Sequence, residues 1–110
     1  MSKLIKRFLI IFLLQWVCVY ADEMPVIQLT ARDGHWIPDI VAVPANTKFK
    51  LTIKNDGPGP EEFESHELHK EKVLGEGVQS FLIFRPLAPG EYPFFGEFHI
   101  ETAQGKIVAK

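Results

Sequence analysis

A glutamate and a histidine lie two residues apart near the C-terminus, where together they could bind a metal ion. They are Glu97 and His99, in the run Gly96-Glu97-Phe98-His99 that ends an aromatic-rich segment. Side chains two residues apart in an extended strand point to the same side. A carboxylate beside an imidazole is therefore a reasonable ligand pair for one ion. A pair of ordinary surface residues is the alternative interpretation.

A second group of carboxylates lies earlier in the chain. Packed carboxylates repel one another and raise each other's pKa, and a bound cation relieves that repulsion. Carboxylates with one or two imidazoles suit copper(II), iron or manganese better than copper(I), which prefers sulfur. Clustered glutamates are nevertheless most often a solvated face, and composition alone favours that interpretation. The glutamates of this group are Glu61, Glu62, Glu64, Glu67 and Glu71.

Two further histidines lie in the same charged segment. His66 and His69 are three residues apart. On a helical turn they would share a face and could bind one ion. Two ordinary exposed histidines are the alternative for this pair.

These segments have to be brought together by a fold made of short strands. Proline, glycine and asparagine interrupt the chain at short intervals, which is typical of strands separated by turns. In residues 47–54 Phe49, Leu51 and Ile53 alternate with polar residues, which predicts a strand with one buried face. About seven such strands indicate an all-β sandwich. The predicted strands cover residues 26–31, 40–43, 47–54, 62–65, 78–84, 91–98 and 105–109.

One segment is expected to be helical, and the aromatic residues are expected to be core. Residues 66–73 contain helix formers and charge pairs such as Glu67 with Lys70, which predicts one short helical segment there. Aromatic side chains on the strands of a small sandwich need no cofactor to explain them. The expected core aromatic residues are Phe63, Phe81, Phe84, Phe94, Phe95 and Phe98.

The first residues have the composition of a secretory signal peptide. Basic residues at positions 3–7 precede an apolar run at residues 8–17, which is too short to span a bilayer comfortably. We expect cleavage after Ala21, so that residues 1–21 are the signal peptide. Residues 22–110 would then form one periplasmic domain with no membrane insertion. An uncleaved anchor is the alternative, and the polar residues from Asp22 onward argue against it.

Removal of the signal peptide would change the chemistry of the chain in two ways. Cys18 is the single cysteine, so the exported domain would have neither a thiol nor a disulfide. Its stability would depend on its core and on any bound metal. The signal peptide also carries three positive charges, so its loss would change the formal net charge from −2 to −5. This acidic net charge argues against nucleic-acid binding, because such binding needs clustered lysine and arginine side chains.

Five short motifs occur in this order along the chain: Glu61-Glu62-Phe63-Glu64-Ser65, Glu71-Lys72-Val73, Pro89-Gly90-Glu91-Tyr92, Gly96-Glu97-Phe98-His99 and Thr102-Ala103-Gln104-Gly105. The set is similar to the cupredoxin-like proteins of bacterial high-affinity iron-uptake systems, whose domain also occurs in a related iron-uptake lipoprotein. The resemblance covers about residues 27–109 and implies a cupredoxin-like Greek-key β-sandwich over residues 22–110.

The resemblance implies a metal site near the strand ends that lacks a thiolate. Blue-copper proteins of this fold carry a cysteine three residues before a histidine, and Gly96 stands at that position before His99. A blue-copper centre depends on His₂Cys ligation, so any copper here is expected to be non-blue, with iron as a second candidate metal. Carried onto this sequence, the principal ligands are Glu62, Glu64, Glu97 and His99, and the secondary ones are His66 and Glu71.

The resemblance also implies a role in iron import. The family's proposed activity is the oxidation of Fe(II), as a ferroxidase-type oxidoreductase component, or the relay of electrons to an iron permease. The expected partners are that permease and a periplasmic iron- and copper-binding protein. A non-redox metal carrier and a metal-free interaction module of the permease complex are the alternatives. Substitution of His99 would remove metal binding under the first two interpretations and change nothing under the third.

Overall fold

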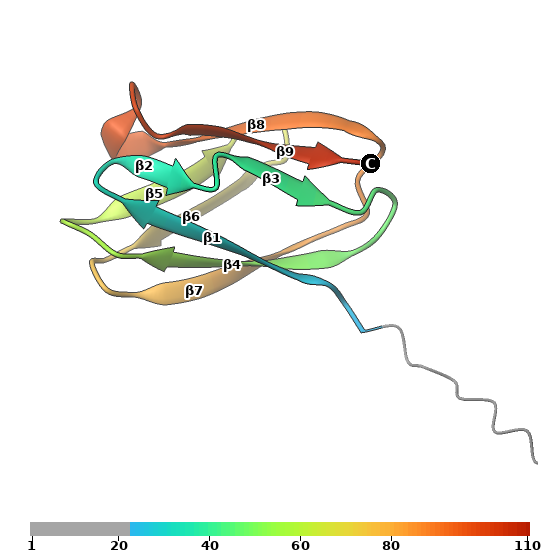
Figure 1. Cartoon of the computed structure of the whole chain (residues 1–110), viewed down its shortest axis with the longest axis horizontal. Coiled ribbons are helices and arrows are strands. Elements are labelled where there is room, and N and C mark those ends of the chain that lie inside the picture. The colour runs from blue at the N-terminus through green and yellow to red at the C-terminus, as the bar shows by residue number, and fades with distance from the viewer. Residues whose placement is uncertain (1–22) are drawn as a thin grey trace, which may run out of the picture.

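The structure is a computed structural model that describes residues 23–110, so the expected signal peptide, residues 1–21, lies outside the described residues. Two β-sheets pack face to face (Figure 1). The first has the order β2 (His35–Ile37), β1 (Val26–Arg32), β4 (Phe49–Asn55) and β7 (Gln79–Phe84). The second has the order β3 (Ile40–Val43), β9 (Gln104–Ala109), β8 (Gly90–Gly96), β5 (Glu61–Ser65) and β6 (Lys70–Leu74). A single 3₁₀ turn, η1 (Glu97–His99), joins β8 to β9 within the described residues.

The prediction of an all-β sandwich is confirmed, with nine strands in place of about seven. The two extra strands are β2, which follows a turn at Asp33 and Gly34, and β6. Most neighbouring strands are antiparallel, but β1 pairs with β4 and β3 pairs with β9 in parallel. A parallel pair cannot be joined by a hairpin, so the chain passes through the other sheet between its two strands. Within residues 23–110 no helix has the length and apolar character needed to cross a membrane.

The predicted helical segment at residues 66–73 is wrong. Residues 66–69 form a turn, and β6 then pairs with β5 so that Ser65 lies opposite Lys70. His69 has a φ of 54°, which lies outside the helical region. Helix propensity is a weak preference that tertiary contacts can override. Here the antiparallel pairing of residues 70–74 with β5 makes this segment a strand. His66 and His69 therefore do not share a helix face.

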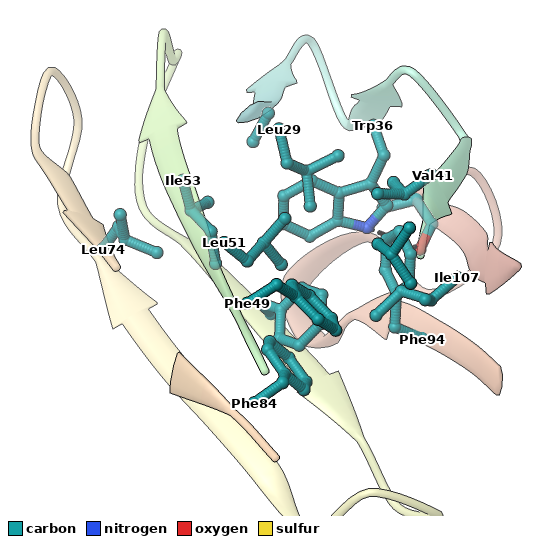
Figure 2. Close-up of a cluster of buried hydrophobic side chains, with 14 of the residues drawn as sticks. Leu29, Trp36, Val41, Phe49, Leu51, Ile53, Leu74, Phe84, Phe94 and Ile107 are labelled. Carbon is teal, nitrogen blue, oxygen red and sulfur yellow. Dashed lines mark hydrogen bonds between the residues drawn. The ribbon is translucent and has the colours of Figure 1, made fainter. Parts of the chain in front are cut away.

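The core lies between the sheets, and aliphatic side chains surround a group of five aromatic ones (Figure 2). Trp36 packs edge-on against Phe63 and Phe94, with ring centroids 5.9 and 5.7 Å apart, and its indole N–H donates to the carbonyl of Ala103 at 3.2 Å. Phe84 is buried as well, as expected. Three expected core residues differ: Phe95 is half-buried, and Phe81 and Phe98 are 48% and 49% exposed.

Four connections come together at one end of the sandwich, on the left in Figure 1. Contacts join them: the Asp33 N–H donates to the Gly57 carbonyl, and the Gly59 N–H donates to the Glu76 carboxylate. Gly34 has a φ of 75°, and a Cβ there would lie 3.0 Å from the His99 ring, so this turn requires glycine. We call this the η1 end, and it comprises residues 33–34, 56–60, 75–78 and 97–103.

Truncation of the central indole tests the packing of the core. Trp36→Ala removes a side chain that is only 3% exposed, and large-to-small changes of this kind cost about 3–5 kcal/mol. We expect urea unfolding to report a loss of that size. Phe98→Ala, at a half-exposed aromatic residue, should cost far less. Equal losses for the two variants would show that Trp36 does not organise the core.

Candidate metal centre

Three glutamates converge at the η1 end of the second sheet. Glu62 and Glu64 lie on the outer face of β5, and Glu97 opens η1. One carboxylate oxygen of each of the three lies within 4.8 Å of the others. The alternation of β5 explains the placement, because Glu61, Phe63 and Ser65 are buried while the two residues between them face outward.

Two more of the predicted ligands lie beside this group. Glu71 on β6 stands directly opposite Glu64 on β5, and residues opposite each other in an antiparallel pair share a face. The Nδ1 atom of His66 is 3.5 Å from a carboxylate oxygen of Glu64, and its ring packs against Phe95. We call Glu62, Glu64, Glu71 and Glu97 the acidic cluster, with His66 at its margin.

The proximity of these groups changes their protonation. Desolvation raises the pKa of Glu62, and the charges of Glu64, Glu71 and Glu97 raise it further. Desolvation also raises the pKa of Glu64, aided by a hydrogen bond with Glu97 and opposed by the charge of His66. Like charges held together disfavour ionisation. At neutral pH the cluster therefore costs stability, and a cation placed among its oxygens would offset that cost.

His99 is placed differently from the expectation. Its Nδ1 atom is 2.6 Å from a carboxylate oxygen of Glu61, while its side chain stays 41% exposed. Strand β8 ends at Gly96 rather than Phe98, and the chain continues as the 3₁₀ turn η1. Successive residues of a 3₁₀ turn rotate by about 120°, so the expected same-side arrangement of Glu97 and His99 does not occur.

Glu61 is the residue whose role was missed. Its side chain is only 4% exposed. One carboxylate oxygen contacts His99, and the other accepts the backbone N–H groups of Glu62 at 3.0 Å and Phe98 at 3.1 Å. The signal was present in the sequence: period-two alternation puts Glu61 on the same side as Phe63, in the core. A buried carboxylate needs such partners, so Glu61 ties β5 to η1.

Glu61 also fills the space beside Gly96. A Cβ at Gly96 would lie 2.7 Å from the Cβ of Ala103 and 2.9 Å from the carboxylate carbon of Glu61. Real Cβ atoms do not approach this closely, so no side chain fits there without rearrangement. The position that the sequence comparison assigns to a thiolate is therefore closed by a carboxylate.

The available donor atoms decide which metal would fit. Oxygen dominates the acidic cluster, with the His66 imidazole as the neighbouring nitrogen. Hard oxygen donors suit copper(II), iron and manganese and give no advantage to copper(I). The residues therefore fit a non-blue copper or an iron ion, and they do not fit a blue-copper centre.

Removal of the His99 imidazole tests the Glu61 contact. His99→Ala leaves a buried carboxylate oxygen without its partner, and such a loss costs about 1–3 kcal/mol. Urea unfolding at neutral pH should report a loss in this range. His99→Asn keeps a side-chain N–H donor and should lose less. A His99→Ala variant as stable as the wild type would rule out a structural role for this contact.

The raised pKa values predict how stability depends on pH. A raised pKa means that the folded state binds the proton more tightly than the unfolded chain, so stability falls as the pH rises through the folded-state pKa. We expect Glu64→Gln to raise the melting temperature at pH 7 and to leave it unchanged at pH 3, where the carboxyls are protonated. Glu67→Gln, outside the cluster, is the matched control. A lower melting temperature for Glu64→Gln at pH 7 would contradict the repulsion.

Comparison with known proteins supports the architecture at two levels. The Cupredoxin-like domain family matches residues 7–109. The uncharacterised protein RP394 of Rickettsia prowazekii (strain Madrid E) is 39% identical over 115 residues, which cover 97% of this chain and 92% of the relative.

Solved structures share the fold at low sequence identity. The metal-binding domain of the Cu(I)-exporting P-type ATPase CopA of Streptococcus pneumoniae D39 is 16% identical with a TM-score of 0.68, over 77% of this chain and 84% of that one. Auracyanin A of Chloroflexus aurantiacus is 12% identical with a TM-score of 0.67, over 80% of this chain and 100% of that one. These likenesses match the observed sandwich, and the chain belongs to the family of cupredoxin-like domains.

Proposed function

We propose that this chain is an exported, periplasmic metal-binding protein that assists iron import. The observation that carries the proposal is the approach of the Glu62, Glu64 and Glu97 oxygens to within 4.8 Å of one another. Two structural relatives add support for a metal: auracyanin A is described as a "blue" copper protein, and the CopA domain was solved with Cu(I). Copper is the proposed resident metal, and iron is the proposed substrate.

The acidic cluster would hold the ion on hard oxygen donors. Glu62, Glu64 and Glu97 are the proposed ligands, with Glu71 and His66 close enough to complete the set or to orient it. His99 is proposed as a support for the end of the sandwich, through Glu61, in place of the expected role as a ligand. A bound copper(II) ion would supply a one-electron acceptor at this face.

The donor set also favours the oxidation of Fe(II). Any carboxylate oxygen of the acidic cluster that contacts the substrate iron would stabilise hard Fe(III) over Fe(II) and so lower the potential of the iron. The reaction is the loss of one electron from Fe(II) to give Fe(III), and that electron must pass to a redox partner, because a single site cannot store the four electrons that O₂ reduction needs. The proposed partners are an iron permease and a periplasmic iron- and copper-binding protein, on the strength of the motif resemblance.

A second candidate is a metal carrier without redox turnover. The observation that favours it is the exposure of Glu97 and the outward orientation of Glu62 and Glu64, because a surface site releases its ion to a partner readily. A metal-free interaction module is the third candidate. It is favoured by Glu61, whose two carboxylate oxygens already have protein partners in the His99 ring and two backbone N–H groups.

Metal titration of matched variants tests the site. We expect copper(II) to bind the wild type and to bind Glu62→Gln/Glu64→Gln at least tenfold more weakly, since two of three oxygen donors lose their charge. Calorimetry should report binding, and EPR should show a tetragonal copper(II) signal. The copper-loaded protein should have no intense blue colour. Glu67→Gln/Glu101→Gln removes the same charge away from the cluster and should bind as the wild type does. If both double variants weakened copper(II) binding equally, the binding would depend on net charge and not on the acidic cluster.

The redox role is separable from binding. With the partner proteins present, copper-loaded wild type should speed the loss of Fe(II), and Glu62→Gln/Glu64→Gln should not. Metal binding without faster Fe(II) loss would leave the carrier as the better account. If the protein bound neither copper nor iron, the metal-free interaction module would become the better account of its function.

A further inference from the structure

Each sheet of the sandwich ends in two edge strands, and three of the four edges are short or charged. Edge strand β2 has three residues and β3 has four, and β6 carries charged side chains at Lys70, Glu71 and Lys72. Short length and charge are the usual means by which proteins prevent a free edge from pairing with another chain. These three edges are therefore protected.

Strand β7 is the exception. It has six residues, Gln79 to Phe84, and no charged side chain. In the described part of the chain its backbone pairs with β4 on one side and with no strand on the other. It is thus a free and uncharged edge of about 20 Å.

The hydrogen-bond pattern identifies the free groups of β7. The Asn55 N–H donates to the Val78 carbonyl at 2.9 Å, so this pair belongs to the bonded class of the antiparallel ladder. Bonded and non-bonded pairs alternate, and Ser80, Leu82 and Phe84 consequently bond to β4. The N–H and carbonyl groups of Gln79, Phe81 and Ile83 point away from β4, toward the free edge.

The side chain at the middle of this edge is apolar and half-exposed. Phe81 is 48% exposed, and its neighbours on the same face of β7 are Gln79, which is exposed, and Ile83, which is half-buried. Phe81 lies on the outer face of the first sheet, where the Lys50 ammonium sits 4.3 Å from the centre of its ring. An aromatic residue in this position lies outside the core and contributes little to it, although it is available to a partner.

We propose that two copies of this chain pair in antiparallel fashion along β7, across a twofold axis at Phe81. Phe81 then lies opposite Phe81 of the second copy, and Gln79 lies opposite Ile83. In each of these pairs both residues present free backbone groups, so about six new hydrogen bonds form. The two four-stranded sheets become one sheet of eight strands, and the acidic clusters on the other sheets stay exposed.

The charges around β7 favour a second copy as the occupant. Glu76 precedes the strand and Arg85 follows it, so antiparallel pairing brings the acidic flank of one copy toward the basic flank of the other. Lys50 stands opposite Ile83 and Lys54 opposite Gln79 on β4. In the proposed register the lysines of the two copies are three strand spacings apart, about 14 Å, which exceeds the screening length of about 8 Å at physiological salt.

Sedimentation of matched variants tests the pairing. The protein expressed from the full-length sequence should sediment as a dimer at micromolar to millimolar concentration. Phe81→Lys places two like charges opposite each other at the axis and should weaken dimerisation at least tenfold. Phe98→Lys makes the same change at an equally exposed phenylalanine of the η1 end and should leave the dimer intact. Circular dichroism checks that both variants are folded.

Two results would overturn the proposal. A wild-type chain that is monomeric throughout this range would show that the edge does not pair with itself, and an extended segment of another protein would become the candidate occupant. A dimer that resists Phe81→Lys as well as it resists Phe98→Lys would place the interface elsewhere.

A disulfide tests the register directly. In a Cys18→Ser background, Phe81→Cys introduces the single thiol, and bonded opposite residues have Cα atoms about 5.5 Å apart, within reach of a disulfide. Oxidation should convert most of the protein to a covalent dimer. Val73→Cys, on the other sheet and 60% exposed, should not crosslink. Failure of Phe81→Cys to crosslink faster than Val73→Cys would exclude an axis at Phe81.

Discussion

The contact between the buried Glu61 carboxylate and the His99 imidazole determines the η1 end of this protein. Glu61 satisfies both of its oxygens through His99 and two backbone N–H groups, and so joins β5 to η1. The same carboxylate occupies the space beside Gly96. Because β5 alternates, burial of Glu61 turns Glu62 and Glu64 outward. Closure of the interior position and exposure of the acidic cluster are therefore two consequences of one placement.

The metal site proposed for this protein differs in position from the thiolate site of a blue-copper protein. The space beside Gly96, where the sequence resemblance implies a thiolate in blue-copper proteins, is filled here by Glu61, which contacts His99. The carboxylates gathered on the outer face of β5 and β6 are destabilised by their own repulsion, as the raised pKa values of Glu62 and Glu64 indicate. Groups that cost stability without a ligand are frequent at functional sites, and an oxygen-rich surface site favours harder ions.

Much of the fold could be predicted from local patterns, whereas the errors came from pairing between distant segments. The alternation of Phe49, Leu51 and Ile53 predicted β4 correctly. The charged residues of β6 have good helix propensity, and only their ladder with β5 makes them a strand. Strand β8 ends at Gly96, and just beyond it the Phe98 N–H donates to Glu61, which is far away in sequence. Phe81 was expected in the core, but the apolar run of β7 does not alternate, so the sequence does not show which face is buried; pairing with β4 places Phe81 opposite Thr52 on the outer face.

The position of bound metal in a crystal tests the central claim most directly. Crystals soaked with copper(II) and measured at the copper absorption edge would locate the ion from its anomalous scattering. An anomalous peak among the Glu62, Glu64 and Glu97 carboxylates, with the Glu61–His99 contact unbroken, is the predicted result. A peak on His99 with Glu61 displaced would show that the end of the sandwich opens to bind copper, which would contradict a site on the outer face.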